Sequence, residues 1–191
     1  IIMNVLVAFL IYAFVLMIWG ERKTPNASVK NGIWVIDSVM HKFGFQNGDK
    51  IISVNGDTIK NFEDIQLKVL IGGRNVVLER EGKIMELPLP IDLIDKLITR
   101  KDKKRILMAE RLPAILGKYK DKDTANGKKA GLQPFDQILA VNGESVNFVD
   151  EINRIGAKNK GGVVNLDVKR NNDSVQLSCK VNMDGRLELA L

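Results

Sequence analysis

Few side chains in this sequence have the type and spacing that catalysis or metal binding requires. The chain contains one histidine, His41, and one cysteine, Cys179. His41 is followed by Lys42 and not by the glutamate of a zinc-binding H-E-x-x-H helix. Cys179 is typical of a small buried residue on a strand, and a lone cysteine forms no internal disulfide. We therefore expect no catalytic residue and no metal ligand in this chain.

Two aspartates, Asp49 and Asp136, occupy equivalent positions of an internal repeat. Residues 42–56 read K-F-G-F-Q-N-G-D-K-I-I-S-V-N-G, and residues 129–143 read K-A-G-L-Q-P-F-D-Q-I-L-A-V-N-G. More than half of the positions are identical, which indicates two copies of one small domain. In each copy the aspartate opens a strand that ends in an Asn-Gly turn, so we expect both carboxylates to be structural.

The residues after each Asn-Gly turn also correspond. Asn61 and Asn147 each precede a phenylalanine and stand three residues before an aspartate. This N-cap pattern predicts helices that begin at Phe62 and Phe148. A Gly-Gly pair and a β-rich run follow each helix. At 191 residues, the chain has room for two such domains.

The first residues of the sequence are almost entirely apolar. Residues 1–19 contain no charge, and Asn4 is their one strongly polar side chain. As an α-helix they would span about 29 Å, and they lack the basic start of a signal peptide. We expect a transmembrane helix over residues 1–20 and a polar connector over residues 21–31. Because the chain starts with Ile1, we expect an internal fragment.

The rest of the sequence divides after residue 110. The first domain, residues 32–110, includes a helix with apolar periodicity and a basic linker, together residues 91–105. The basic run is either a solvated linker or a contact with anionic headgroups. The second domain covers residues 111–191. We expect closing strands at residues 106–109 and 187–191, and a polar loop over residues 118–128 that borders a groove.

The net charge does not indicate a nucleic-acid partner. Lys and Arg exceed Asp and Glu by 29 to 23, but aromatic residues make up only 6% of the chain. No nucleic-acid-binding motif is present, so we expect no nucleic acid.

The string from Gly131 to Gly143, G-L-Q-P-x-D-x-I-L-x-V-N-G, resembles the signature of bacterial PDZ domains. The first copy departs from it at Phe45 and at Asn47-Gly48. The resemblance implies a mainly β fold with α (α+β), in which two PDZ domains, each a partly open β-barrel with two helices, follow the transmembrane helix. PDZ domains bind an extended peptide as an added strand between an edge strand and a helix.

We expect the edge strands at residues 32–37 and 114–119. The helices would supply an apolar wall, although the same side chains could instead hold each helix to its barrel. Ala114 and Gly117 are small and let a backbone approach closely, so we expect the second domain to bind better than the first, where Trp34 is bulky. The predicted peptide-binding residues are Gly32, Ile33, Phe62, Ile65 and Val69 in the first domain, and Leu112, Pro113, Ala114, Ile115, Phe148, Ile152 and Ile155 in the second.

An apolar helix followed by two PDZ repeats is similar to the middle of the RseP-type site-2 proteases (regulator of sigma-E proteases), which are intramembrane zinc metalloproteases. Asn4 matches an asparagine near the start of that family's second membrane helix. The resemblance implies a parent enzyme whose zinc ligands lie outside this chain, and PDZ domains on the periplasmic side of the bacterial inner membrane. Its partners would be the membrane and the C-terminal or extended peptides of membrane-anchored proteins of the anti-sigma-factor type. Asp184 is not the family's aspartate ligand, because a polar turn surrounds it.

Other functions remain open at this point. The PDZ domains either bind peptide or exclude bulky substrates by size. The chain could belong to a non-enzymatic single-pass PDZ scaffold of a secretion or envelope complex, or to a membrane-anchored trypsin-like protease with a Ser-His-Asp domain upstream. An H-E-x-x-H on a preceding helix favours the metalloprotease, whereas a Met start and a short cytoplasmic tail favour the scaffold.

The lone His41 and lone Cys179 predict that the isolated chain neither binds zinc stoichiometrically nor hydrolyses peptides. Metal analysis of the purified chain and a peptide-cleavage assay check this prediction. One tightly bound zinc ion per chain would contradict it.

Overall fold

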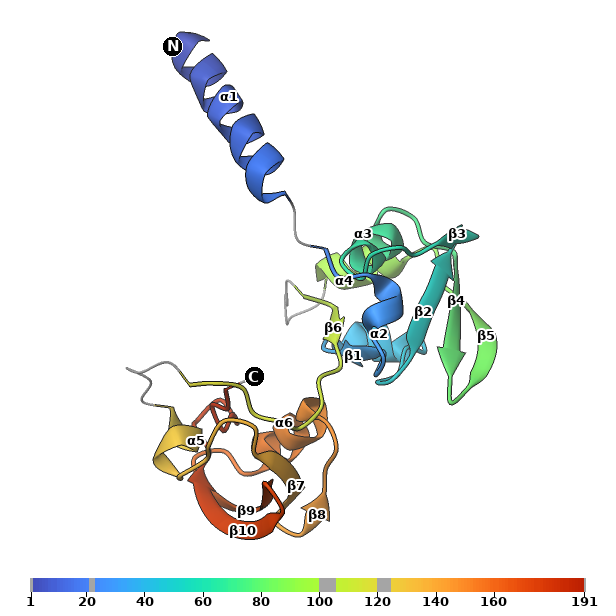
Figure 1. Ribbon diagram of the computed structural model, residues 1–191. Coiled ribbons are helices and arrows are strands. Elements are labelled where there is room, and N and C mark those ends of the chain that lie inside the picture. The colour runs from blue at the N-terminus through green and yellow to red at the C-terminus, as the bar shows by residue number, and fades with distance from the viewer. Residues whose placement is uncertain (1, 21–22, 100–105, 120–124, 191) are drawn as a thin grey trace.

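The structure, a computed structural model, describes residues 2–20, 23–99, 106–119 and 125–190. These residues form an α+β fold with three sheets (Figure 1). The basic run over residues 100–105 and the centre of the expected loop, residues 120–124, lie outside the described residues.

The first four-stranded sheet has the strand order β3-β2-β4-β5. Asn55 and Gly56 make the β2–β3 turn with φ values of 52° and 83°, as the Asn-Gly pair predicts. The helix α3 (Asp64–Leu70) follows the turn. The strands are β2 (Lys50–Val54), β3 (Asp57–Thr58), β4 (Asn75–Arg80) and β5 (Lys83–Pro88).

The second four-stranded sheet repeats this arrangement with the order β10-β9-β7-β8. The register shifts once between β2 and β4, at Ile51/Ser53, and at the equivalent place between β7 and β9, at Ile138/Ala140. The helix α6 (Val149–Lys158) corresponds to α3. The strands are β7 (Gln137–Val141), β8 (Glu144–Ser145), β9 (Val163–Arg170) and β10 (Asp173–Lys180).

The third sheet consists of β1 (Ile33–Val35) and β6 (Met108–Glu110), which pair antiparallel. Short helices complete the described chain. They are η1 (Asn26–Ser28), α2 (Ser38–Lys42), α4 (Leu93–Thr99) and α5 (Asn126–Lys129).

Two separate apolar cores lie beneath the two larger sheets. Phe45, Met40 and Leu78 are fully buried in the first core. Leu166 and Cys179 are fully buried in the second core. Burial raises the pKa of the Cys179 thiol to about 11, so the thiol stays protonated at neutral pH and is a poor nucleophile.

The expected transmembrane helix over residues 1–20 is wrong. No helix among the described residues is long and apolar enough to cross a membrane. The helix α1 covers Ile2–Trp19. Gly20 lies outside the helix with a φ of 63°. The expected inner-membrane localisation depended on this helix and is wrong with it.

The expected pair of partly open barrels after a membrane helix is also wrong, because the strands form three sheets. β1 and β6 pair with each other and do not join the larger first sheet. Residues 114–119 form no strand, since only isolated bridges hold them. Residues 187–190 likewise form no strand, although the Gly117 N–H donates to the Ala190 carbonyl at 2.8 Å. The helices α3 and α6 begin at Asp64 and Val149, later than predicted.

A buried aspartate ties each repeat together at the start of its central strand. Asp49 accepts two hydrogen bonds from Arg80, at 2.7 and 2.8 Å. Asp136 accepts two from Arg170, at 2.9 and 2.8 Å. The side chains of Asp49 and Asp136 are 0% and 1% exposed. Burial alone would raise the pKa of Asp136, but the hydrogen bonds from Arg170 and from the Gln133 N–H hold that pKa below its ordinary value.

We predict that Asp136→Ala lowers the free energy of unfolding by about 3 kcal/mol, because Arg170 then loses the buried charge that it pairs with. Chemical denaturation at neutral pH measures the change. Asp173→Ala, which removes an exposed aspartate of the same sheet, is the matched control and changes stability little.

The pH dependence of the free energy of unfolding also tests whether the ionised Asp136 carboxylate stabilises the fold. A carboxyl whose folded pKa lies below its unfolded value stabilises the fold above the unfolded pKa, and this contribution is lost as the pH falls through the folded pKa. The stability difference between the wild type and Asp136→Asn therefore narrows below about pH 4. A difference that stays constant down to about pH 2 contradicts the assignment.

Candidate peptide-binding site

The predicted edge strand of the first half, β1, has hydrogen bonds along both edges. β6 pairs with one edge. On the other edge, the Ile33 N–H donates to the Asp49 carbonyl at 2.9 Å, and the Gly48 N–H donates to the Ile33 carbonyl at 2.8 Å. The Asn47 side chain accepts the Val35 N–H at 2.8 Å. β1 therefore offers no free edge to an incoming strand.

The predicted residues of the second half lie close together, where residues 112–114 meet the start of α6. The Val149 N–H donates to the Leu112 carbonyl at 3.0 Å, and the Ala114 N–H donates to the Asn147 carbonyl at 2.8 Å. Pro113 forms a β-bridge with Phe148 between these two bonds. Residues 112–114 are therefore paired with residues 147–149 at the start of α6, and Ile115 remains 45% exposed beside them.

Most of the predicted wall residues on the helices face the cores. Ile65 and Val69 on α3 are buried in the first core. Ile152 and Ile155 on α6 are buried in the second core. Phe62 and Phe148 are half-buried and keep an accessible surface. Of the predicted helix residues, these two phenylalanines are the ones that a ligand can reach.

Sequence reasoning missed the strand with an open edge, β6. The Arg111 N–H donates to the Gly32 carbonyl at 2.9 Å, and the Leu107 carbonyl accepts the Ile36 N–H at 2.9 Å. Backbone groups alternate along an antiparallel strand, so those of Met108 and Glu110 point away from β1. They have no hydrogen-bond partner among the described residues.

The helix α3 is bonded to the start of β6. The Leu107 N–H donates to the Gln66 side-chain oxygen at 2.9 Å, which ties α3 to the start of β6. Leu70 stands one turn after Gln66 on the same helical face and is partly buried against the first core. Leu67, also on α3, is 57% exposed. A second pair of apolar helix residues beyond the core pair is the sequence signal that could have indicated this face.

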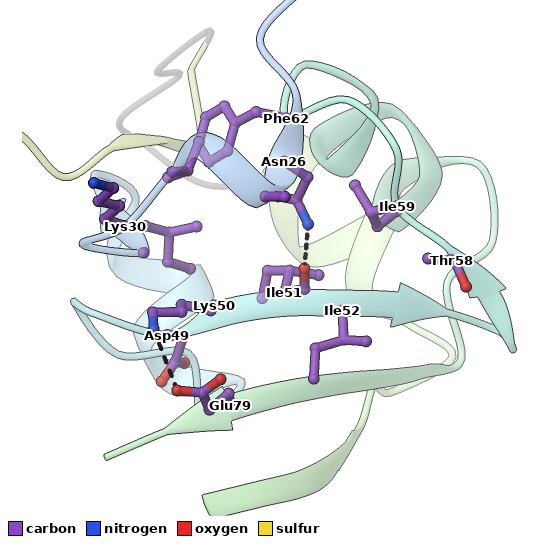
Figure 2. A pocket seen from close by; sticks show the side chains of 14 residues that line it. Asn26, Lys30, Asp49, Lys50, Ile51, Ile52, Thr58, Ile59, Phe62 and Glu79 are labelled. Carbon is purple, nitrogen blue, oxygen red and sulfur yellow. Dashed lines mark hydrogen bonds and ion pairs between the residues drawn. The ribbon is translucent and has the colours of Figure 1, made fainter. Parts of the chain in front are cut away.

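A cavity of about 350 Å³ lies on the other side of the first half, along β2 (Figure 2). Three predicted residues, Gly32, Ile33 and Phe62, line it. The Asn26 side chain donates to the Ile51 carbonyl at 2.7 Å across the cavity. The rim carries the Lys50 and Glu79 pair, whose charged atoms are 3.2 Å apart.

Arg111 connects the two halves of the chain. Its guanidinium donates to Asp150 at 3.0 and 3.2 Å and to Glu151 at 2.9 Å, and it stacks 3.8 Å from the centre of the Phe148 ring. Asn47 of the first half also donates to Asp150, at 2.8 Å. The Asp150 side chain is only 4% exposed, so this polar contact is largely shielded from water.

The described residues do not fit a metal ion. Within the described ranges, no three His, Cys, Asp or Glu side chains come together as a possible metal site. The Nδ1 atom of His41 lies 3.2 Å from the Phe45 carbonyl oxygen, and Cys179 is buried in the second core. The described residues therefore do not supply a ligand set for the zinc ion that the family resemblance implies.

The chain is similar in sequence to bacterial proteases, although no family model matches it. It is 28% identical over 156 residues to a protein of Treponema pallidum (strain Nichols) assigned as a zinc metalloprotease, a match that covers 78% of this chain and 33% of the relative. It is 28% identical over 176 residues to the periplasmic pH-dependent serine endoprotease DegQ of Escherichia coli (strain K12), covering 81% and 38%.

A DegP-like periplasmic serine endoprotease of Chlamydia muridarum (strain MoPn / Nigg) is 26% identical over 151 residues, covering 70% of this chain and 30% of the relative. The chain thus spans about a third of the length of the curated relatives that it matches. It is related to bacterial proteases at a coarse level.

We predict that Arg111→Ala uncouples the two halves of the chain, because Asp150 loses both its bidentate partner and its shielding. Amide ¹⁵N relaxation measures the effect as shorter and separate rotational correlation times for the two halves. Arg111→Lys gives correlation times between those of the wild type and Arg111→Ala. The lysine ammonium keeps the charge, but it neither binds a carboxylate with two parallel hydrogen bonds nor stacks on an aromatic ring as a guanidinium does.

The control is Arg154→Ala on α6, which removes the exposed ion pair with Glu144 of β8 and leaves the relaxation unchanged. Identical relaxation in the wild type and Arg111→Ala would show that other contacts hold the halves together.

Proposed function

We propose that this chain is the PDZ-type, substrate-binding part of a longer bacterial protease. The coarse relatedness to proteases supports a proteolytic parent. Of the protease classes, we favour a zinc metalloprotease of the RseP-type site-2 family, because the repeat resembles the tandem in the middle of that family and one relative is assigned as a zinc metalloprotease. The zinc ligands would lie outside this chain, and the substrates would be membrane-anchored proteins of the anti-sigma-factor type.

The observation that carries the binding function is the edge of β6 where the backbone groups of Met108 and Glu110 have no hydrogen-bond partner among the described residues. An extended peptide that adds to this edge would pair with the N–H and C=O groups of Met108 and Glu110. Its alternate side chains would lie against Leu70 and Leu67 on α3, since successive side chains of a strand point to opposite faces. Backbone pairing gives affinity without reading sequence, and the apolar helix face selects apolar side chains.

The chain contributes binding and selection in this proposal, and the bond cleavage takes place elsewhere in the parent. A substrate segment held as a strand has a fixed direction and register, which sets the part of the substrate that reaches the catalytic centre. A scaffold without a protease would use the same strand edge, and the presence of H-E-x-x-H in the parent sequence separates the two functions.

The test is a titration of the ¹⁵N-labelled chain with peptides that end in an apolar carboxyl terminus. We expect saturable shifts of the Met108 and Glu110 amides, and loss of binding when alternate amides of the peptide are N-methylated, because methylation removes the pairing N–H groups. Leu70→Asp abolishes binding. Ile84→Asp changes an exposed residue on β5 and leaves binding intact.

If the amides of Met108 and Glu110 do not shift with any peptide, β6 is not a binding edge. In that case the two halves of the chain would select substrates by excluding bulky proteins. The N-methylated peptide gives this answer with the unmodified chain, so it does not depend on whether Leu70→Asp folds.

A further inference from the structure

The turn before β7 holds Phe135 in a backbone conformation that suits glycine. Phe135 has a φ of 69° and is the third residue of a β-turn, in which the Asp136 N–H donates to the Gln133 carbonyl at 3.2 Å. A positive φ at this position of a turn favours glycine, because a Cβ atom crowds the backbone there. The first repeat has Gly48 at the equivalent place, with a φ of 96°. The second repeat therefore has a strained backbone at a turn where the first has glycine.

The packing of the second half does not account for Phe135. Its side chain is 71% exposed, and it is not among the side chains that form the second core or pack against it. An exposed aromatic ring on a strained backbone contributes little to the stability of the chain that carries it. The strain at Phe135 therefore indicates a role outside the fold.

Two further exposed apolar side chains lie next to Phe135 along β7. Ile115 forms a β-bridge with Gln137 and is 45% exposed, and Leu139 is 38% exposed. Phe135 and Leu139 stand two residues before and two residues after Gln137. In an antiparallel pair these are the diagonal neighbours of the residue opposite Gln137, so they flank Ile115. We call Ile115, Phe135 and Leu139 the β7 patch.

Two lysines border the β7 patch. Lys169 of β9 lies opposite Gln137, and Lys118 stands two residues after the carbonyl that accepts the Phe135 N–H. None of the ion pairs between described residues involves Lys118 or Lys169. Asp167, on the same face of β9, accepts a hydrogen bond from a glutamine of β10 at 2.9 Å. The two lysines are therefore available to carboxylates of a partner.

The polar groups of this surface favour one kind of partner over two others. A second copy bound face to face would bring Lys118 and Lys169 of both copies together, which like-charge repulsion opposes. A lipid surface would cover the Gln137 side-chain amide with hydrocarbon, although this amide makes no hydrogen bond to the described residues and needs a partner when buried. A protein segment supplies hydrogen-bonding groups beside its apolar side chains.

We propose that the β7 patch is a second interaction surface, which binds an acidic and apolar segment of a partner protein. Phe135 is the anchor, as aromatic residues are in many interfaces, and Ile115 and Leu139 extend the apolar contact. Gln137 hydrogen bonds to the segment, and carboxylates of the segment lie at the two bordering lysines. This surface is on the second half, is separate from β6 and does not depend on the function proposed above.

The test is a titration of the ¹⁵N-labelled chain with the peptide acetyl-Glu-Leu-Glu-Phe-Glu-Leu-amide, whose amidated end removes the free carboxyl terminus. We expect saturable shifts of the Phe135 and Leu139 amides. A peptide with lysine in place of each glutamate binds about tenfold more weakly, because it loses two exposed ion pairs. Lys169→Glu narrows or reverses this preference. Lys180→Glu, at an exposed site on β10 at the far end of the same sheet, is the control and leaves the preference unchanged.

Phe135→Gly separates a binding role from a structural one. Glycine adopts the positive φ without strain, so this substitution leaves Tm the same or raises it, whereas binding of the acidic peptide is lost. Val163→Ser is the control. It removes a side chain of β9 that is 62% exposed, beyond the part of β9 that pairs with β7, and it leaves binding intact.

A lower Tm for Phe135→Gly would show that Phe135 supports the fold and would overturn the proposal. Equal affinity for the acidic and basic peptides, or no shift at a saturating dose of either, would overturn it as well. Co-sedimentation with phosphatidylglycerol vesicles that Phe135→Gly abolishes would assign the patch to a lipid surface instead. A concentration-dependent dimer that Phe135→Gly abolishes would assign it to a second copy. Shifts confined to Met108 and Glu110 would place the peptide at β6 and count against the β7 patch.

Discussion

The structure depends on one repeated interaction, the buried aspartate that pairs with an arginine from the neighbouring strand. Asp49 and Asp136 stand where β2 and β7 begin, and Arg80 and Arg170 end β4 and β9. Each arginine also donates to the carbonyl of the glycine that opens the repeat. A buried carboxylate without its partner is strongly unfavourable. The pair therefore fixes the turn before each central strand, and with it the backbone groups that the strand presents to its neighbours.

The local part of this architecture could be predicted from the sequence. The Asn-Gly turns have the expected positive φ at Asn55 and Asn142, and the Glu81-Gly82 hairpin follows from turn chemistry. The occupancy of strand edges could not be predicted in the same way. Whether β1 is open depends on Asn47 and Gly48, which pair with it only once the chain has folded back. Periodicity reports which side chains face a core, but it does not report which backbone groups are already paired.

The helix wall shows the same limit. Ile65 and Val69 have the spacing of an apolar stripe, and that stripe serves the first core. A helix that packs on a sheet needs one apolar face for the core, so only apolar residues beyond that face are available to a ligand. Leu67 meets this condition on α3 because it is 57% exposed, whereas Leu70 packs partly against the core. At α1 an uncharged apolar run predicted a membrane span, but no helix among the described residues is long and apolar enough to cross a membrane.

Arg111 lies where the proposed binding edge of β6 and the two halves of the chain meet. It follows Glu110, the last residue of the open strand, and its N–H is bonded to Gly32, which lines the cavity along β2. Its guanidinium is bonded to Asp150 in the first turn of α6. A peptide that shifts β6 or Gly32 must therefore either carry α6 with it or break a shielded charge pair. Because breaking such a pair is costly, the two halves would move together, and binding in the first half would set the orientation of the second.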